Sequence, residues 1–137
     1  MPKRARAAPA RPAAPRRFSA SVLKLLRASR MLAVRAGAGD HRFTGIWFVV
    51  VGDRLFVRPW SDDARGWRRA FLREPVGAIA IGSREVPVRA RTARGESLFD
   101  AVDAAYAEKY DTKASQKWVR GFRLARRRKT TTELLPA

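Results

Sequence analysis

The spacing of the hydrophobic positions changes several times along the chain, and each change predicts a new element. Apolar residues recur at helical spacing after Ser19, a residue type that favours a helix start, so we predict a helix over residues 19–30. Residues 31–36 (MLAVRA) are typical of a strand. Gly52-Asp53 separates two apolar runs rich in β-branched and aromatic residues, which predicts a β-hairpin over residues 43–60.

The second half of the chain alternates between helical and strand patterns. A carboxylate of Asp62 or Asp63 is expected to accept hydrogen bonds from the first amides of a helix that starts at about Ala64, carries Trp67 on its inner face and ends at Pro75. A second hairpin, two more helices and a final Thr-rich strand are expected over residues 77–92, 95–110, 113–125 and 130–136. Six strands in antiparallel hairpins with peripheral helices indicate an α+β fold, and closure into a small barrel would protect the sheet edges.

Length and composition narrow the function classes. With 137 residues, the chain has room for one compact core. It has no cysteine and only His41 as histidine, which argues against disulfides, thiol chemistry, a metal centre and a Ser-His-Asp triad. No segment approaches the ~20 apolar residues of a membrane span, and no secretory signal pattern is present, so the expected location is the cytoplasm, without a membrane partner.

The net charge of +18 by itself favours a nucleic-acid partner, but its meaning depends on where the basic residues lie. Residues 1–17 carry six Lys and Arg and no acid, and their Ala/Pro/Arg composition predicts a disordered basic arm preceding a domain over residues 18–137. Residues 117–129 carry seven more basic side chains, interleaved with Trp118 and Phe122. These two aromatics are four residues apart and are expected to face inward, leaving a solvated basic face with non-specific affinity for nucleic acid.

A phosphate-binding group is one interpretation of Arg58, Ser61 and Arg65, because guanidinium, hydroxyl and free helix-start amides all donate to anionic oxygens. The alternative is that Asp62 or Asp63 caps the helix while both arginines form surface ion pairs.

Two tryptophans near the ends of the predicted 43–60 hairpin are candidate ring-binding residues. Trp47 and Trp60 could stack on a flat aromatic ligand ring, with core packing as the alternative that we favour for Trp47.

Four separated motifs carry a family resemblance: IWFVVVGDRLFVRPW, GWRRAF, DAAYAEKY and TTTELLP. Over residues 18–137 the chain resembles an uncharacterised bacterial domain-of-unknown-function family that is similar to FMN-binding split-barrel proteins, a group including pyridoxamine phosphate oxidases and deazaflavin-dependent nitroreductases. The resemblance implies a six-stranded split barrel, a homodimer with a cofactor cleft at its interface, and FMN or deazaflavin as cofactor.

The same resemblance implies roles for individual residues. Arg42 and Thr44 match positions that bind the flavin ring or its side chain, with an exposed turn arginine and a plain strand threonine as the alternatives. Trp67 matches a helix that, together with the loop before it, holds the cofactor phosphate. The chain departs from the family pattern in the loop over residues 58–63 and at Glu133, where arginine is usual. Both departures weigh against phosphate binding.

The sequence therefore predicts a flavin- or deazaflavin-binding oxidoreductase, with no catalytic residue assigned. Two alternatives belong to other classes: a basic nucleic-acid-associated protein, and a dimeric interaction module without a cofactor.

Overall fold

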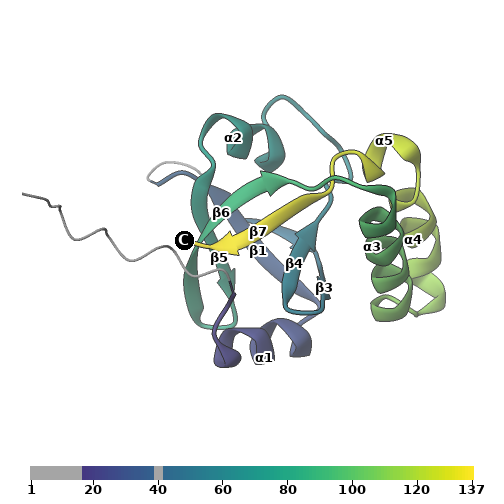
Figure 1. Cartoon of the computed structure of the whole chain (residues 1–137), viewed down its shortest axis with the longest axis horizontal. Helices are drawn as coiled ribbons and strands as arrows, with labels where there is room; N and C mark the ends of the chain where they lie inside the picture. Colours follow the sequence, from purple (N-terminus) through teal and green to yellow (C-terminus); the bar gives the residue numbers. More distant parts are fainter. Residues whose placement is uncertain (1–16, 39–41) are drawn as a thin grey trace, which may run out of the picture.

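A seven-stranded antiparallel sheet, curled into a nearly closed barrel, forms the centre of the molecule (Figure 1). The computed structural model describes residues 17–38 and 42–137. The strands are β1 (Met31–Ala36), β2 (Thr44–Trp47), β3 (Val49–Val51), β4 (Arg54–Val57), β5 (Val76–Ile81), β6 (Arg84–Thr92) and β7 (Thr132–Pro136), arranged in the order β2-β1-β5-β6-β7-β4-β3. The predicted α+β class with an antiparallel barrel is confirmed, while the predicted basic arm falls almost wholly outside the described residues.

The helices lie around the barrel. Figure 1 shows α1 across one end, α2 at the opposite end, and α3, α4 and α5 beside β3 and β4. Their bounds are α1 (Ala20–Ala28), α2 (Trp67–Arg73), α3 (Glu96–Lys109), α4 (Gln116–Phe122) and α5 (Ala125–Arg128), with a 3-10 turn η1 (Lys113–Ser115) before α4. No helix in the described part of the chain combines the length and apolar character needed to cross a membrane.

The helix starts follow local chemistry only in part. The Ser19 hydroxyl accepts a hydrogen bond from the amide of Val22 at 3.3 Å and caps α1, as predicted. The predicted carboxylate cap of α2 is wrong. That helix begins later, after Gly66, without a side-chain cap. Asp62 instead accepts hydrogen bonds from the guanidinium groups of Arg68 and Arg69, because two full charges attract it more strongly than backbone dipoles.

The predicted strand over residues 43–51 is two strands, which is why the sheet has seven and not six. Its first part, β2, pairs with β1, and its second part, β3, pairs with β4. Between them, the amide of Phe48 donates to the Tyr110 hydroxyl at 3.1 Å, and the Phe48 carbonyl accepts from the Lys109 amine at 3.1 Å. These two side chains from the end of α3 satisfy the backbone at Phe48 in place of a neighbouring strand.

Alternating side chains divide the interior into two cores. In β4, Leu55 and Val57 face the barrel interior, where α1 and Phe71 of α2 complete the packing. Phe56 faces the other way, into a second core formed with the inner sides of α3 and α4. A fully buried Phe, Val or Leu side chain contributes about 1.5–3 kcal/mol relative to exposure, so both faces of β4 hold the sheet in place.

Arg58 connects the barrel to the helices. Its side chain is completely buried, and its Nε donates to the Thr131 hydroxyl at 2.8 Å. The guanidinium also donates to the carbonyl groups of Phe122 and Phe99, at 3.0 and 3.2 Å. The Asp103 carboxylate provides the neutralising charge, since a buried guanidinium without one would be strongly unfavourable.

The acidic side of α3 faces a second arginine. The carboxylates of Glu96, Asp100 and Asp103 all form ion pairs with Arg128 of α5. Asp103 therefore bridges the buried Arg58 and the partly exposed Arg128. This arrangement ties α5 to α3 and uses the three carboxylates for packing of the two helices.

Glu133 of β7 is held between two arginines from neighbouring strands. Its buried carboxylate accepts hydrogen bonds from Arg54 at 2.9 and 3.0 Å and from Arg91 at 2.8 and 3.1 Å. Burial alone would raise the pKa of Glu133, but the two guanidinium groups outweigh it and lower the pKa below its ordinary value. The glutamate that departs from the family pattern is thus part of the barrel wall.

Asp103→Asn should destabilise the fold far more than Asp100→Asn. The first substitution leaves the buried Arg58 without a counter-charge and should lower the free energy of unfolding by about 3–5 kcal/mol. The second removes an exposed partner of Arg128 and should cost less than about 1 kcal/mol. Urea unfolding of both variants measures the difference, and equal losses would show that Arg58 does not depend on Asp103.

Glu133→Gln should make stability less dependent on acid pH. The lowered native pKa means that the carboxylate stabilises the fold above its unfolded pKa of about 4.3, and that this stabilisation is lost as pH falls through the native pKa. Urea unfolding should therefore show the variant less stable than wild type at pH 7, with the difference shrinking between about pH 5 and pH 3. A difference independent of pH would contradict the charge-based role, and Glu85→Gln, at an exposed carboxylate, serves as the control.

Candidate functional site

The strand β2 borders two cavities. It lies at one end of the strand order, so one of its edges has no strand partner among the described residues. At one end of the strand, Thr44 pairs with Val34, and both line a small polar cavity. At the other end, Trp47 pairs with Met31, and both line a larger aromatic cavity.

The polar cavity, of about 170 Å³, brings together four of the residues singled out in the sequence. Thr44 comes from β2 and Arg42 precedes it, while Trp67 begins α2 and Arg65 lies in the turn before that helix. Arg35 of β1 completes the lining with a third guanidinium group. The cavity therefore combines three positive charges, a hydroxyl and an indole, contributed by three separate segments of the chain.

The three arginines of this cavity keep hydrogen-bonding capacity. The Arg35 guanidinium lies over the Phe43 ring at 4.5 Å and reaches Glu85 only at 3.5 Å. Its Nε is buried and has no hydrogen-bond partner. Arg42 and Arg65 are exposed and form no hydrogen bond or ion pair with the rest of the described chain. Such a donor set fits a phosphate group, which accepts several charge-assisted hydrogen bonds at once.

The aromatic cavity, of about 370 Å³, lies at the other end of β2. Its lining is mostly apolar and comes from β1, β2, the segment after β4 and α4: Met31, Gly45, Ile46, Trp47, Arg58, Trp60, Trp118 and Phe122. The Trp47 indole stacks on the Tyr110 ring at a centroid distance of 3.9 Å. This volume lies within the range of small-molecule sites.

Trp60 forms one wall of the aromatic cavity and is 40% exposed. It packs edge-on against Phe122 at 5.4 Å and against Trp118 at 4.8 Å. A Cβ at Gly121 would lie 2.2 Å from the Trp60 ring, so this close approach to α4 requires glycine. The Arg127 guanidinium covers another part of the ring at 3.7 Å, leaving Trp60 well fixed.

The polar groups behind Trp47 hold their protons at neutral pH. Burial raises the pKa of Tyr110 to about 12, and its hydroxyl donates to the carbonyl of Arg30. Burial lowers the pKa of Lys109 to about 8, and its amine lies 3.2 Å from the centre of the Phe48 ring. Both side chains are engaged by the backbone at the β2–β3 break, which gives them a structural role.

Arg58, Ser61 and Arg65 do not come together to form the predicted phosphate-binding group. Arg58 is buried in the interior, so the expectation that it would form a surface ion pair is also wrong. The Ser61 hydroxyl donates to Asp63 at 2.9 Å, and Ser61 lines neither of the two cavities that β2 borders. Arg65 alone of the three reaches the polar cavity.

Two residues of these cavities were missed by the sequence reasoning. Arg35 stands in the otherwise apolar segment MLAVRA, and its charge in a predicted strand was a usable signal. Trp118 was expected to face inward with Phe122, yet it is 39% exposed whereas Phe122 is buried. The i, i+4 spacing predicts a shared helix face but does not say how far the packing partner extends over it.

Comparison with solved structures places the fold among split barrels. A conserved hypothetical protein from Mycobacterium tuberculosis matches with a TM-score of 0.53 and 15% identity, covering 88% of this chain and 79% of that one. A Listeria innocua protein provisionally assigned as a pyridoxamine 5'-phosphate oxidase matches with a TM-score of 0.56 and 14% identity, covering 85% and 90%. A heme-binding protein from Mycobacterium smegmatis matches with a TM-score of 0.50 and 15% identity, covering 86% and 51%.

At these identities the likenesses establish the fold alone. No curated protein matches the sequence. A family profile does match residues 23–134, which is most of the chain and includes every residue of both cavities. The chain belongs to the family described as uncharacterized proteins conserved in bacteria (DUF2255).

Proposed function

We propose that this chain binds a phosphate-bearing flavin, FMN, or a deazaflavin, and acts with it as an oxidoreductase. The observation that carries the proposal is the polar cavity, where Arg35, Arg42 and Arg65 surround one space and the buried Arg35 Nε has no partner. This cavity is too small for a three-ring system but suits a phosphate group. The provisional assignment of the Listeria innocua protein as a pyridoxamine 5'-phosphate oxidase is consistent with this class of cofactor.

The aromatic cavity would receive the ring of the cofactor. The strand pairs that border the two cavities, Val34 with Thr44 and Met31 with Trp47, are three residues apart along β2. At about 3.3 Å per residue this separation is roughly 10 Å, a distance that a ribityl chain can bridge. Trp47 and Trp60 would then contact the ring, and the open edge of β2 would offer backbone groups to the linking chain.

The chemistry of hydride transfer would come from the bound cofactor. The residues of this chain would bind and orient it: three arginines and Thr44 would neutralise and hold the phosphate, while the indoles of Trp47 and Trp60 would shield the ring from water. No general acid or base is assigned, because the tyrosine and lysine nearest to the aromatic cavity are committed to the backbone at Phe48.

The phosphate should dominate affinity if the polar cavity receives it. Isothermal titration should give FMN a Kd at least tenfold lower than that of riboflavin, which lacks the phosphate. Arg42→Ala and Arg65→Ala should each raise the Kd for FMN about tenfold or more and leave the Kd for riboflavin unchanged, because each removes a charge-assisted hydrogen bond. Arg73→Ala, an exposed arginine at the end of α2, should change neither value.

Four results would contradict this proposal. Equal affinity for FMN and riboflavin would show that the polar cavity does not bind the phosphate. Equal effects of the three arginine variants would show that only general charge attraction holds FMN. Absence of binding for FMN and deazaflavin, or a clear preference for hemin in the same titration, would exclude a flavin-type cofactor.

We further infer a homodimer that covers the open edge of β2. Met31 of β1, the strand that pairs with β2, is 52% exposed and lines the aromatic cavity. Sedimentation velocity should show a dimer for the wild-type chain and a monomer for Met31→Glu, because a charge at this apolar position opposes burial. Leu72→Glu, at an exposed position of α2, should remain dimeric. A monomeric wild-type chain would refute the inference.

A further inference from the structure

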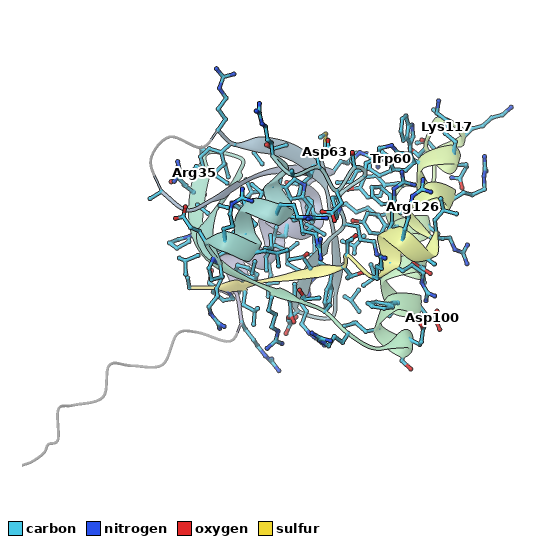
Figure 2. All side chains as sticks on the ribbon, turned by 90° about the horizontal axis from the view of Figure 1, so that it is seen from above. Arg35, Trp60, Asp63, Asp100, Lys117 and Arg126 are labelled. Atoms are coloured by element: carbon cyan, nitrogen blue, oxygen red, sulfur yellow. The ribbon has the colours of Figure 1, made fainter. Side chains whose placement is uncertain are left out.

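The outer surface of η1, α4 and α5 carries basic side chains that no acidic residue neutralises. Residues 112–132 contain no Asp or Glu. Exposed bases recur through this segment, and none of them forms an ion pair with another described residue: Lys113, Lys117, Arg120, Arg123, Arg126 and Lys129. We name these six residues the basic face. Figure 2 shows Lys117 and Arg126 on the side of the molecule where α4 and α5 lie, opposite Arg35.

The acids that face α5, and Glu133 after it, are already committed, so most of the basic face keeps its charge. The three carboxylates of α3 that approach α5 all bind Arg128, which points toward α3 and is only 21% exposed. Glu133, the next acidic residue along the chain, binds Arg54 and Arg91. These ion pairs therefore hold four acids on the inner side of the segment, and of its nearest acidic neighbours in the sequence only Asp111, before η1, is exposed without an ion pair among the described residues.

A flat aromatic ring adjoins this positive surface. Trp118 of α4 is 39% exposed, and the amine of Lys117 lies 4.9 Å from its ring. Trp60 packs edge-on against Trp118 and supports it from the barrel side. A partly exposed indole beside an unpaired cation matches the surfaces on which nucleic-acid bases stack while cations contact the phosphates.

We propose that the basic face and Trp118 bind single-stranded nucleic acid. A duplex would offer its phosphates but not its base faces, whereas a single strand offers both, and the exposed Trp118 ring needs a base face. An anionic membrane fits less well, because α4 and α5 have only seven and four residues and present no long apolar face. This inference shares Trp118 with the aromatic cavity of the cofactor proposal, but the six residues of the basic face line neither of the two cavities.

Two sets of charge reversals test the basic face against general charge attraction. The site variant is Lys117→Glu with Arg120→Glu and Arg123→Glu. The control variant is Lys24→Glu with Arg73→Glu and Arg89→Glu, at exposed bases of α1, α2 and β6 that form no ion pair with other described residues. Both variants lower the net charge equally, and thermal melting checks that each is folded. The probe is fluorescein-labelled dT15, measured by fluorescence anisotropy at 50 and 200 mM salt.

The site variant should raise the Kd at least tenfold more than the control variant and should reduce the slope of log K against log salt by about two, since roughly 0.7 counterions are released per phosphate contact. Equal weakening by both variants, or no binding of dT15 by the wild-type chain at 50 mM salt, would overturn the proposal.

Stacking is tested separately with Trp118→Ala. Loss of one stacked base should raise the Kd about fivefold or more while leaving the salt slope unchanged, because no phosphate contact is lost. Tight binding to double-stranded DNA of the same length, with no effect of Trp118→Ala, would show that the surface recognises duplex phosphates and would refute the single-strand assignment.

Discussion

The interruption of the sheet at Phe48 is the constraint on which the rest of the structure depends. A continuous strand over residues 43–51 would pair with one neighbour along its whole length. The Tyr110 hydroxyl and the Lys109 amine take over the backbone groups at Phe48, so the chain can leave β1 and join β4 without exposing an unpaired amide and carbonyl in the interior. The two ends of the strand order are thus consecutive in the chain, which brings the barrel close to closure.

This interruption also places the candidate site. Because β2 does not pair with β4, the hairpin partner predicted for it, β2 is an end strand of the sheet and has one open edge. One end of β2 meets the start of α2 at the polar cavity, and the other meets α4 at the aromatic cavity. The stacking of Trp47 on Tyr110 shows how closely the cavity wall and the break are linked, since the residue that satisfies Phe48 also supports the tryptophan.

Local patterns in the sequence predicted most of the fold. The Ser19 cap, the strand over residues 31–36 and the two hairpin turns depend on side chains and glycines within a few residues, and all are present. The break at Phe48 could not be predicted, because it depends on side chains more than sixty residues away. The burial of Arg58 could not be predicted either. Its charge suggested a surface position, but Asp103 of α3, which is distant in the sequence, provides a buried partner.

Only some residues of the candidate site could be predicted from the sequence, for a related physical reason. Arg42, Thr44, Arg65 and Trp67 line one cavity, because each lies close to an element end whose position the fold determines. Arg58 and Ser61 were grouped with Arg65 through closeness in sequence, and the turn after β4 points them in different directions.

The distribution of charge follows from a shortage of acids. With 12 acidic and 30 basic residues, the chain can neutralise only some of its arginines, and the described carboxylates are shared among them. Asp53, Asp62 and Glu133 each bind two arginines, and Arg128 collects three carboxylates. Desolvation of the carboxylate favours this sharing at Glu133, which is 4% exposed, because a buried carboxylate gains more from a second guanidinium group than one in water does. Exposed bases without an ion pair therefore remain on several elements, and they include those of the basic face and Arg42 and Arg65 at the polar cavity, where an external anion can bind without displacing an internal one.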